Sequence, residues 1–197
     1  MSANIFPSDT VSALILVVGG LFLLARVFPL RKMTRPLRPR LLVNGILSLL
    51  TFMTSFFWVR PTCLMSLSWS AENSFGILNW LGLSSWGELV GGLILLDLSF
   101  FYWHMLSHKL GFIWRFHNVH HFDPELDVST GFRFHFGEII LSAAFRLIQM
   151  MIIGPKLSTF LIFELLFQIE TYFHHSNLKL PLRLEQTLNF LIVTPRM

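Results

Sequence analysis

Long apolar runs constrain what this chain can fold into. Residues 10–30 (TVSALILVVGGLFLLARVFPL) are apolar over about twenty residues, the length that an α-helix needs to cross the hydrocarbon core of a bilayer. Residues 41–59 and 86–106 form a second and a third run. Residues 138–173 are apolar again, and Gly154-Pro155 divides them into two halves that predict a helical hairpin. The sequence therefore predicts an all-α fold, a polytopic membrane helical bundle with four to five transmembrane helices.

Composition supports a membrane protein. The chain is 53% hydrophobic and 13% charged, whereas a soluble domain is about one quarter charged. A single cysteine, Cys63, excludes an internal disulfide framework and a cysteine metal site. The formal net charge of +4 lies beside apolar runs, which indicates membrane orientation rather than binding to nucleic acid.

The basic residues predict the orientation of the chain. The segment RKMTRPLRPR, together with Arg26, carries six positive charges and no acid, and Pro36 and Pro39 favour a loop there. The loop at 60–85 contains one basic residue, Arg60. Because short cytoplasmic loops are enriched in Lys and Arg, we expect the first loop in the cytoplasm and the second outside. The third span then ends at the cytoplasmic boundary.

Histidines gather where that third span ends. Five of the eight lie between Asp97 and His121, in DLSFFYWHMLSHKLGFIWRFHNVHH. Residues four apart on a helix share one face, so the first two imidazoles should be neighbours, and the pattern H-x-x-H-H places the last two one turn beyond the third. In chain order these residues are His104, His108, His117, His120 and His121. Neutral imidazole is a good ligand for iron, zinc and copper.

The predicted hairpin brings further histidines to the same membrane face. The hairpin crosses the membrane and comes back, which returns His174 and His175 to the face that holds the first five histidines. His135 lies just before the hairpin on the same side. All eight histidines are then on one side, as a single site requires. Six or more imidazoles exceed the four ligands of a structural zinc ion and suggest two metal ions.

Among the ionisable residues within the apolar runs, four are candidates for a structural or functional role. Asp97 is seven residues before His104, and two interpretations remain open: an acceptor for the free N–H of a ligand, or a partner for a polar group on another helix. Arg146 and Glu164 lie eight residues before and ten after Gly154, so we predict an ion pair across the hairpin. Glu170 is one turn before His174 and either supports a ligand or faces the membrane interface.

Three motifs carry a resemblance to a known family. HMLSH, FHNVHHFDPELDVSTGFRFHFGE and FHHSNLKLPLRLEQTLNFLIVTPRM resemble the fatty acid hydroxylase/sterol desaturase superfamily, and most closely its bacterial sterol desaturase branch. The resemblance covers residues 86–197. It implies two parts, N-terminal transmembrane helices and loops at 1–85 and a fatty acid hydroxylase/sterol desaturase-like region at 86–197. Phe122 and Phe136 depart from the family pattern, which usually has Ser and often Pro at these positions.

The resemblance implies a membrane di-iron oxygenase whose histidine site faces the cytoplasm, in the inner membrane of a bacterium. Such enzymes use two iron ions, dioxygen and an electron donor such as a cytochrome or ferredoxin system. They hydroxylate or desaturate fatty acyl chains, sterols or carotenoids, or cleave ether lipids. The implied metal ligands are His104, His108, His117, His120, His121 and His175, with His174, His135, Asp97 and Glu170 as supporting residues or further ligands.

One family feature is absent from the sequence. The pattern normally continues into a third H-x-x-H-H box within a few residues of TPRM, where this sequence stops. The resemblance therefore implies that residues 86–197 are an incomplete region and that the 197 residues alone do not turn over a lipid. The alternative is a non-catalytic membrane metal-binding protein, or a relic of such an enzyme.

Overall fold

Helices make up all the regular elements that the computed structural model describes, over residues 8–196. They are α1 (Ser8–Val27), α2 (Leu37–Thr54), the π-helix η1 (Ser55–Val59), α3 (Arg60–Glu72), α4 (Ile77–Leu81), α5 (Ser85–Lys109), α6 (Gly111–His121), the 3-10 helix η2 (Val128–Phe132), α7 (Phe136–Ile153), α8 (Leu157–His175) and α9 (Leu182–Leu188). Within this range the β structure is limited to an isolated bridge between Pro29 and Leu178. The predicted all-α class is confirmed.

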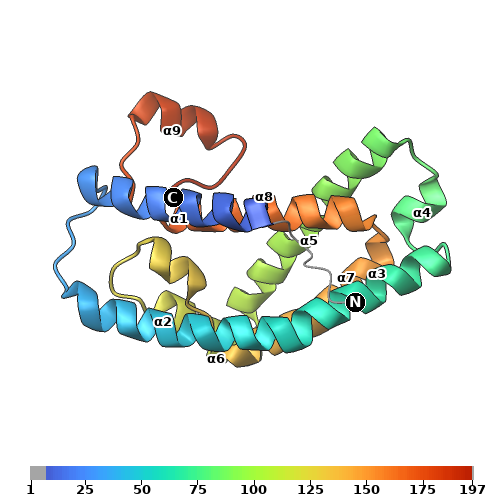
Figure 1. Ribbon diagram of the computed structural model, residues 1–197, viewed down its shortest axis with the longest axis horizontal. Coiled ribbons are helices and arrows are strands. Elements are labelled where there is room, and N and C mark those ends of the chain that lie inside the picture. The colour runs from blue at the N-terminus through green and yellow to red at the C-terminus, as the bar shows by residue number, and fades with distance from the viewer. Residues whose placement is uncertain (1–7, 197) are drawn as a thin grey trace.

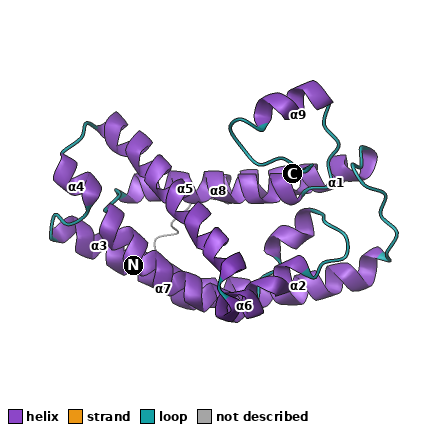
Figure 2. Ribbon diagram, turned by 180° about the vertical axis from the view of Figure 1, so that it is seen from behind, coloured by secondary structure: helices purple, strands orange, loops and turns teal. Residues whose placement is uncertain are grey.

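The helices form an elongated bundle (Figure 1). α2, η1 and α3 follow one another as a long curved rod, and α7 packs along its α3 half. α1 and α8 lie side by side on the opposite flank, and α5 crosses between the two flanks to reach α6. The view from behind shows the same crossing, with α9 and its loops outside the bundle (Figure 2).

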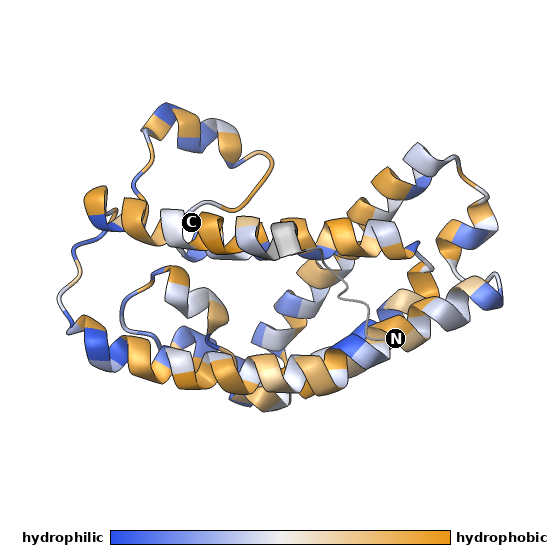
Figure 3. Ribbon diagram, in the orientation of Figure 1, coloured by the Kyte–Doolittle hydropathy of each residue, from blue (hydrophilic) through white to orange (hydrophobic). Residues whose placement is uncertain are grey.

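Three helical stretches are long and apolar enough to cross a membrane, Leu37–Leu81, Ser85–Lys109 and Phe136–Ile153, and a shorter apolar helix covers Ser12–Val27. Large apolar side chains on α2, such as Leu42, are exposed, as expected of a helix that faces lipid. Hydrophilic residues gather in the loop between α1 and α2 and in the segment after α6 (Figure 3). The bundle is that of a membrane protein, and the count of four to five spans stays a prediction.

The second run extends further as a helix than we predicted. Residues 60–85 were expected to form a loop, but α3 continues the rod to Glu72 and α4 follows after a turn. Pro61, at the start of α3, has no N–H to donate, and the wide turn of η1 directly before it accommodates the proline without ending the rod. The predicted loop at 31–40 is likewise shorter, because α2 begins at Leu37 with Pro36 as its N-cap.

The hairpin prediction is confirmed. α7 ends at Ile153, Gly154 adopts the left-handed conformation with φ of 64°, and α8 begins at Leu157. A Cβ atom on Gly154 would lie 2.6 Å from the backbone oxygen of Phe75, so the turn needs glycine for both its conformation and its packing. The turn therefore directs α8 back toward the end of the bundle where α7 began.

Aromatic and aliphatic side chains from α3, α5, α7 and α8 form the core. Leu96 and Met150 are fully buried, and Phe100 packs against Phe163 and Phe167 with ring centroids 5.8 and 4.8 Å apart. This core holds α5 between the two arms of the hairpin. It thereby fixes the C-terminal end of α5 relative to that of α8.

A buried polar network joins the first two helices to the segment after α6. Asp127 accepts hydrogen bonds from Arg26 (3.0 Å) and from Arg40, and both partners form ion pairs with it. Asn44 donates to the Asp123 carboxylate at 2.9 Å, and the Arg133 guanidinium donates to the Asn44 amide oxygen at 3.1 Å. The network fixes residues 123–133 against α1 and α2, and no local sequence pattern predicted it.

The predicted ion pair across the hairpin is confirmed. Arg146 Nη1 lies 2.5 Å from Glu164 Oε1, and the guanidinium stacks over the Phe100 ring at 4.5 Å from its centroid. Both side chains are largely buried. Pairing lowers the cost of placing either charge inside an apolar bundle, so each residue explains the presence of the other.

We predict that the two charges stabilise the hairpin as a coupled unit. Arg146→Met or Glu164→Gln alone leaves an uncompensated buried group, whereas the double variant removes both. The losses in unfolding free energy in detergent should therefore be non-additive, with a coupling of about 0.5–3 kcal/mol. Additive losses would contradict the pairing.

Candidate metal centre

The first histidine pair lies on the last turns of α5. Ser84 caps this helix by accepting a hydrogen bond from Gly87 N at 3.2 Å, and the helix runs without interruption to Lys109. His104 and His108, four residues apart, point the same way, and their Nε2 atoms are 3.1 Å apart. Two nitrogens that share one ion at about 2.0–2.1 Å lie roughly 3 Å apart when the angle at the ion is near 90°.

The second histidine group lies on α6. Leu110, in an extended conformation, separates α6 from α5 and allows the two helices to meet at an angle. His117 and His120 are buried, while His121 is exposed, and the Nε2 atoms of His117 and His121 are 3.1 Å apart. The prediction that H-x-x-H-H is helical is therefore confirmed.

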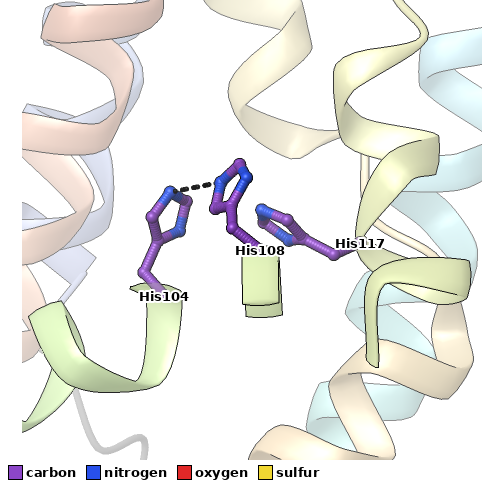
Figure 4. Close-up of side chains that lie close together, drawn as sticks. All are labelled: His104, His108 and His117. Carbon is purple, nitrogen blue, oxygen red and sulfur yellow. Dashed lines mark hydrogen bonds between the residues drawn. The ribbon is translucent and has the colours of Figure 1, made fainter. Parts of the chain in front are cut away.

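The two groups converge. One ring nitrogen from each of His104, His108 and His117 lies within 4.8 Å of the others, and the three rings face a common point (Figure 4). The rings of His108 and His121 are also neighbours, with centroids 4.8 Å apart. Four imidazoles from α5 and α6 thus surround one volume.

A second cluster forms where α8 ends. His175 Nε2 lies 2.6 Å from His120 Nε2, although the two residues are 55 positions apart. His174 packs against His175 with ring centroids 4.2 Å apart, and its Nδ1 is buried without a hydrogen-bond partner among the described residues. The returning hairpin therefore adds imidazoles beside α6, with one ring nitrogen that the protein leaves unused.

Hydrogen bonds at the opposite ring nitrogens orient three of these histidines. His117 Nδ1 lies 2.7 Å from Glu138 Oε1, His175 Nδ1 lies 2.7 Å from the Thr171 carbonyl oxygen, and His120 Nδ1 lies 3.3 Å from the Arg133 carbonyl oxygen. Each acceptor assigns the proton to Nδ1 and leaves the Nε2 lone pair directed at the cluster. Such partners fix ring orientation and raise ligand basicity in metal sites.

Sequence reasoning did not identify Glu138 or Trp114. Glu138 is buried at the start of α7, and an acid inside an apolar run was a signal that could have found it. Trp114 packs over His108 and His121, with ring centroids 5.3 and 5.5 Å away. Its place one turn before His117 offered no comparable signal.

Three predicted supporting residues have other surroundings. His135 accepts a hydrogen bond from Gly137 N at 3.0 Å as the N-cap of α7, and its ring packs against Phe116 and Phe136. Asp97 is exposed and hydrogen-bonds no histidine within the described range. Glu170 accepts a long hydrogen bond, 3.4 Å, from Val193 N.

The comparison with known proteins agrees with the motifs. A sequence model described as fatty acid hydroxylase matches residues 89–197, a span that contains all eight histidines. The chain belongs to the fatty acid hydroxylase family. An ornithine lipid hydroxylase, OlsE, from Rhizobium tropici is 32% identical over 74 residues, which are 38% of this chain and 22% of that protein. No solved structure matches the chain.

The surroundings of two histidines on α6 keep their imidazoles neutral. Desolvation, followed by the neighbouring imidazoles, lowers the pKa of His120 to about 2 and that of His121 to about 4. A group with a folded-state pKa this far below its ordinary value stays deprotonated at neutral pH. Both histidines of this fatty acid hydroxylase family member therefore offer lone pairs to a cation.

We predict that Glu138 tunes metal affinity through His117. Glu138→Ala removes the acceptor at Nδ1 and should lower affinity for Co²⁺ or Fe²⁺ about 10- to 100-fold in anaerobic chelator competition. Glu138→Gln keeps an oxygen acceptor and should restore most of the affinity. Equal affinity in the wild type and Glu138→Ala would show that the carboxylate does not act on the site.

Proposed function

We propose that this chain provides the metal centre of a membrane-bound, dioxygen-dependent di-iron oxidoreductase that hydroxylates or desaturates lipid C–H bonds. The observation that carries the proposal is the convergence of imidazoles from α5, α6 and α8 in a member of the fatty acid hydroxylase family. The apolar helices hold these residues where a bilayer supplies lipid chains.

The donor set fits two iron ions. His104, His108, His117 and His121 surround the first position, and His120 and His175 the second, with the unused His174 Nδ1 beside it. The closest Nε2 pairs are separated by 2.6 to 3.1 Å, near the spacing of nitrogens that share an ion. When bound, iron supplies the activation of dioxygen that side chains alone cannot perform.

The residues around the ligands prepare the site. Glu138 and the two carbonyl oxygens keep Nε2 lone pairs directed inward, which fixes the geometry before any ion arrives. The Trp114 ring packs against His108 and His121 on one side. The lipid carbon must then approach from a side of the cluster that Trp114 does not cover.

The stoichiometry of the proposed reaction determines which partners the enzyme needs. Hydroxylation converts C–H, O₂, two electrons and two protons into C–OH and water, so an electron donor of the cytochrome or ferredoxin class is required. The related OlsE is named for ornithine lipid, and we propose a membrane lipid as the substrate class here. The basic loop at 31–40 supports a cytoplasmic site in a bacterial inner membrane, where such donors are available.

We expect iron content to depend on the converging histidines and not on His135. In the purified full-length gene product, His120→Ala should lose about half of its iron, that of the second position, by mass spectrometry, while His135→Ala, the matched control, should retain both ions. The wild type should contain two irons and form hydroxylated or desaturated lipid in cells. Unchanged iron in His120→Ala would contradict the assignment, and two bound metals without any oxidised lipid would favour a non-catalytic metal-binding protein.

We expect residues 1–197 alone to hold the second iron weakly and to form no product. The first position has four imidazoles, but the second has only His120 and His175, about a third of the ligands of an octahedral site. The measurement is anaerobic iron loading, followed by reductant, dioxygen and membrane lipids. Two tightly bound irons with an oxidised product would show that these residues form a competent site.

A further inference from the structure

A groove lies between the start of α2 and the segment after α6. Its volume is about 470 Å³, and it is shallow and open to the surroundings. Its lining combines Arg35, Arg40 and Arg133 with apolar side chains that include Val43, Phe122 and Pro124. Cationic groups at one end of an apolar wall are the arrangement that an anionic amphiphile needs.

Two of the arginines are held in place by the protein. Arg40 is 7% exposed, donates to the Glu125 carbonyl oxygen at 2.5 Å, and is ion-paired with Asp127. Arg133 donates through Nε to the Val119 carbonyl oxygen at 2.8 Å and through Nη1 to Asn44. Within the described residues no hydrogen bond uses Arg133 Nη2, so a preorganised guanidinium retains a donor for a ligand.

The residues that line the groove include three arginines and no acid. The carboxylates near it are Asp123, Asp127 and Glu125, and each already accepts hydrogen bonds from the protein. Glu125 accepts from the backbone N–H of Arg35, and among residues 8–196 no hydrogen bond or ion pair engages the exposed Arg35 guanidinium. The loop that leads into α2 adds further basic residues and no acid over 31–40.

The apolar side of the groove continues onto the lipid-facing surface of α2. Val43 is 45% exposed and Ile46, almost one turn further on, is 55% exposed, while Phe122 is 68% exposed on the opposite wall. An occupant can therefore place a charged group among the arginines and an acyl chain along α2. A soluble anion would leave this apolar path unused.

We propose that the groove binds the anionic headgroup of a phospholipid from the surrounding bilayer. Basic pockets between membrane helices at the cytoplasmic face commonly hold anionic lipid headgroups. The phosphate is within the reach of Arg35 and Arg133 Nη2, and one acyl chain follows Val43 and Ile46. This lipid is a bound structural component, and its site is separate from the imidazoles.

The groove also adjoins the second histidine group. Phe122 directly follows His121, and the Arg133 carbonyl oxygen is the acceptor for His120 Nδ1. A headgroup held by Arg133 thereby braces the segment that orients His120. The lipid composition of the membrane becomes a factor in the stability of that segment.

Native mass spectrometry of the purified chain tests the proposal, with phosphatidylglycerol and phosphatidylcholine of identical acyl chains as probes. The wild type should retain phosphatidylglycerol preferentially. Arg35→Gln should lower its affinity for phosphatidylglycerol about fivefold, the effect of one basic residue at an anionic membrane surface. Arg38→Gln, the matched control, removes an exposed arginine in the first turn of α2, three residues away in sequence, that does not line the groove, and should leave the affinity unchanged.

Three outcomes would overturn the proposal. Equal losses in Arg35→Gln and Arg38→Gln would indicate general attraction to a basic loop. Equal retention of both lipids would indicate apolar adhesion alone. Displacement of phosphatidylglycerol by glycerol phosphate at matched concentration would assign the groove to a soluble anion, because the acyl path would then contribute nothing.

Discussion

The Asp127 carboxylate, buried between the guanidinium groups of Arg26 and Arg40, connects the first two helices to the histidine-bearing part of the chain. The connection continues through Asn44, which hydrogen-bonds both Asp123 and Arg133. The carbonyl oxygen of Arg133 in turn orients His120. Removing one partner of such a buried pair leaves an uncompensated charge, which costs about 3–5 kcal/mol. The geometry of the second histidine group therefore depends on residues that lie far from it in sequence.

Polar contacts between the apolar helices set their register. Lipid tails are as apolar as leucine, so burying apolar side chains between helices in a membrane contributes little free energy that favours one alignment over another. Here Gln149 donates to Ser99 at 2.6 Å, Thr159 donates to Glu88 at 2.7 Å, and Arg146 pairs with Glu164. Each contact joins a different pair among α5, α7 and α8, and together they place the ends of these helices, with their histidines, at matching depths.

Features with a local or periodic signal could be predicted from the sequence. The apolar runs, the turn at Gly154, the Arg146–Glu164 pair and the helical spacing of His104 and His108 depend on residues close in sequence or on symmetry about a turn. The Asp127 network and the Glu138–His117 contact could not be predicted, because they join residues on separate elements without a pattern that marks them as partners. The helix at 60–72 was not predicted, because the apolar run was taken to end at residue 59. The π-helix at Ser55–Val59 accommodates Pro61, and the helical rod continues past it.

His120 and His175 are in contact although they are 55 residues apart in sequence. The whole α7–α8 hairpin lies in the chain between them. During synthesis the first five histidines emerge while this hairpin is still unmade, so a metal ion that arrives early meets only part of its ligands. His175 joins the others only after α8 has been made and has packed against the bundle. If the proposed metal ion binds between His120 and His175, it links α6 to the end of α8, and retention of the ion would report that α8 is correctly placed.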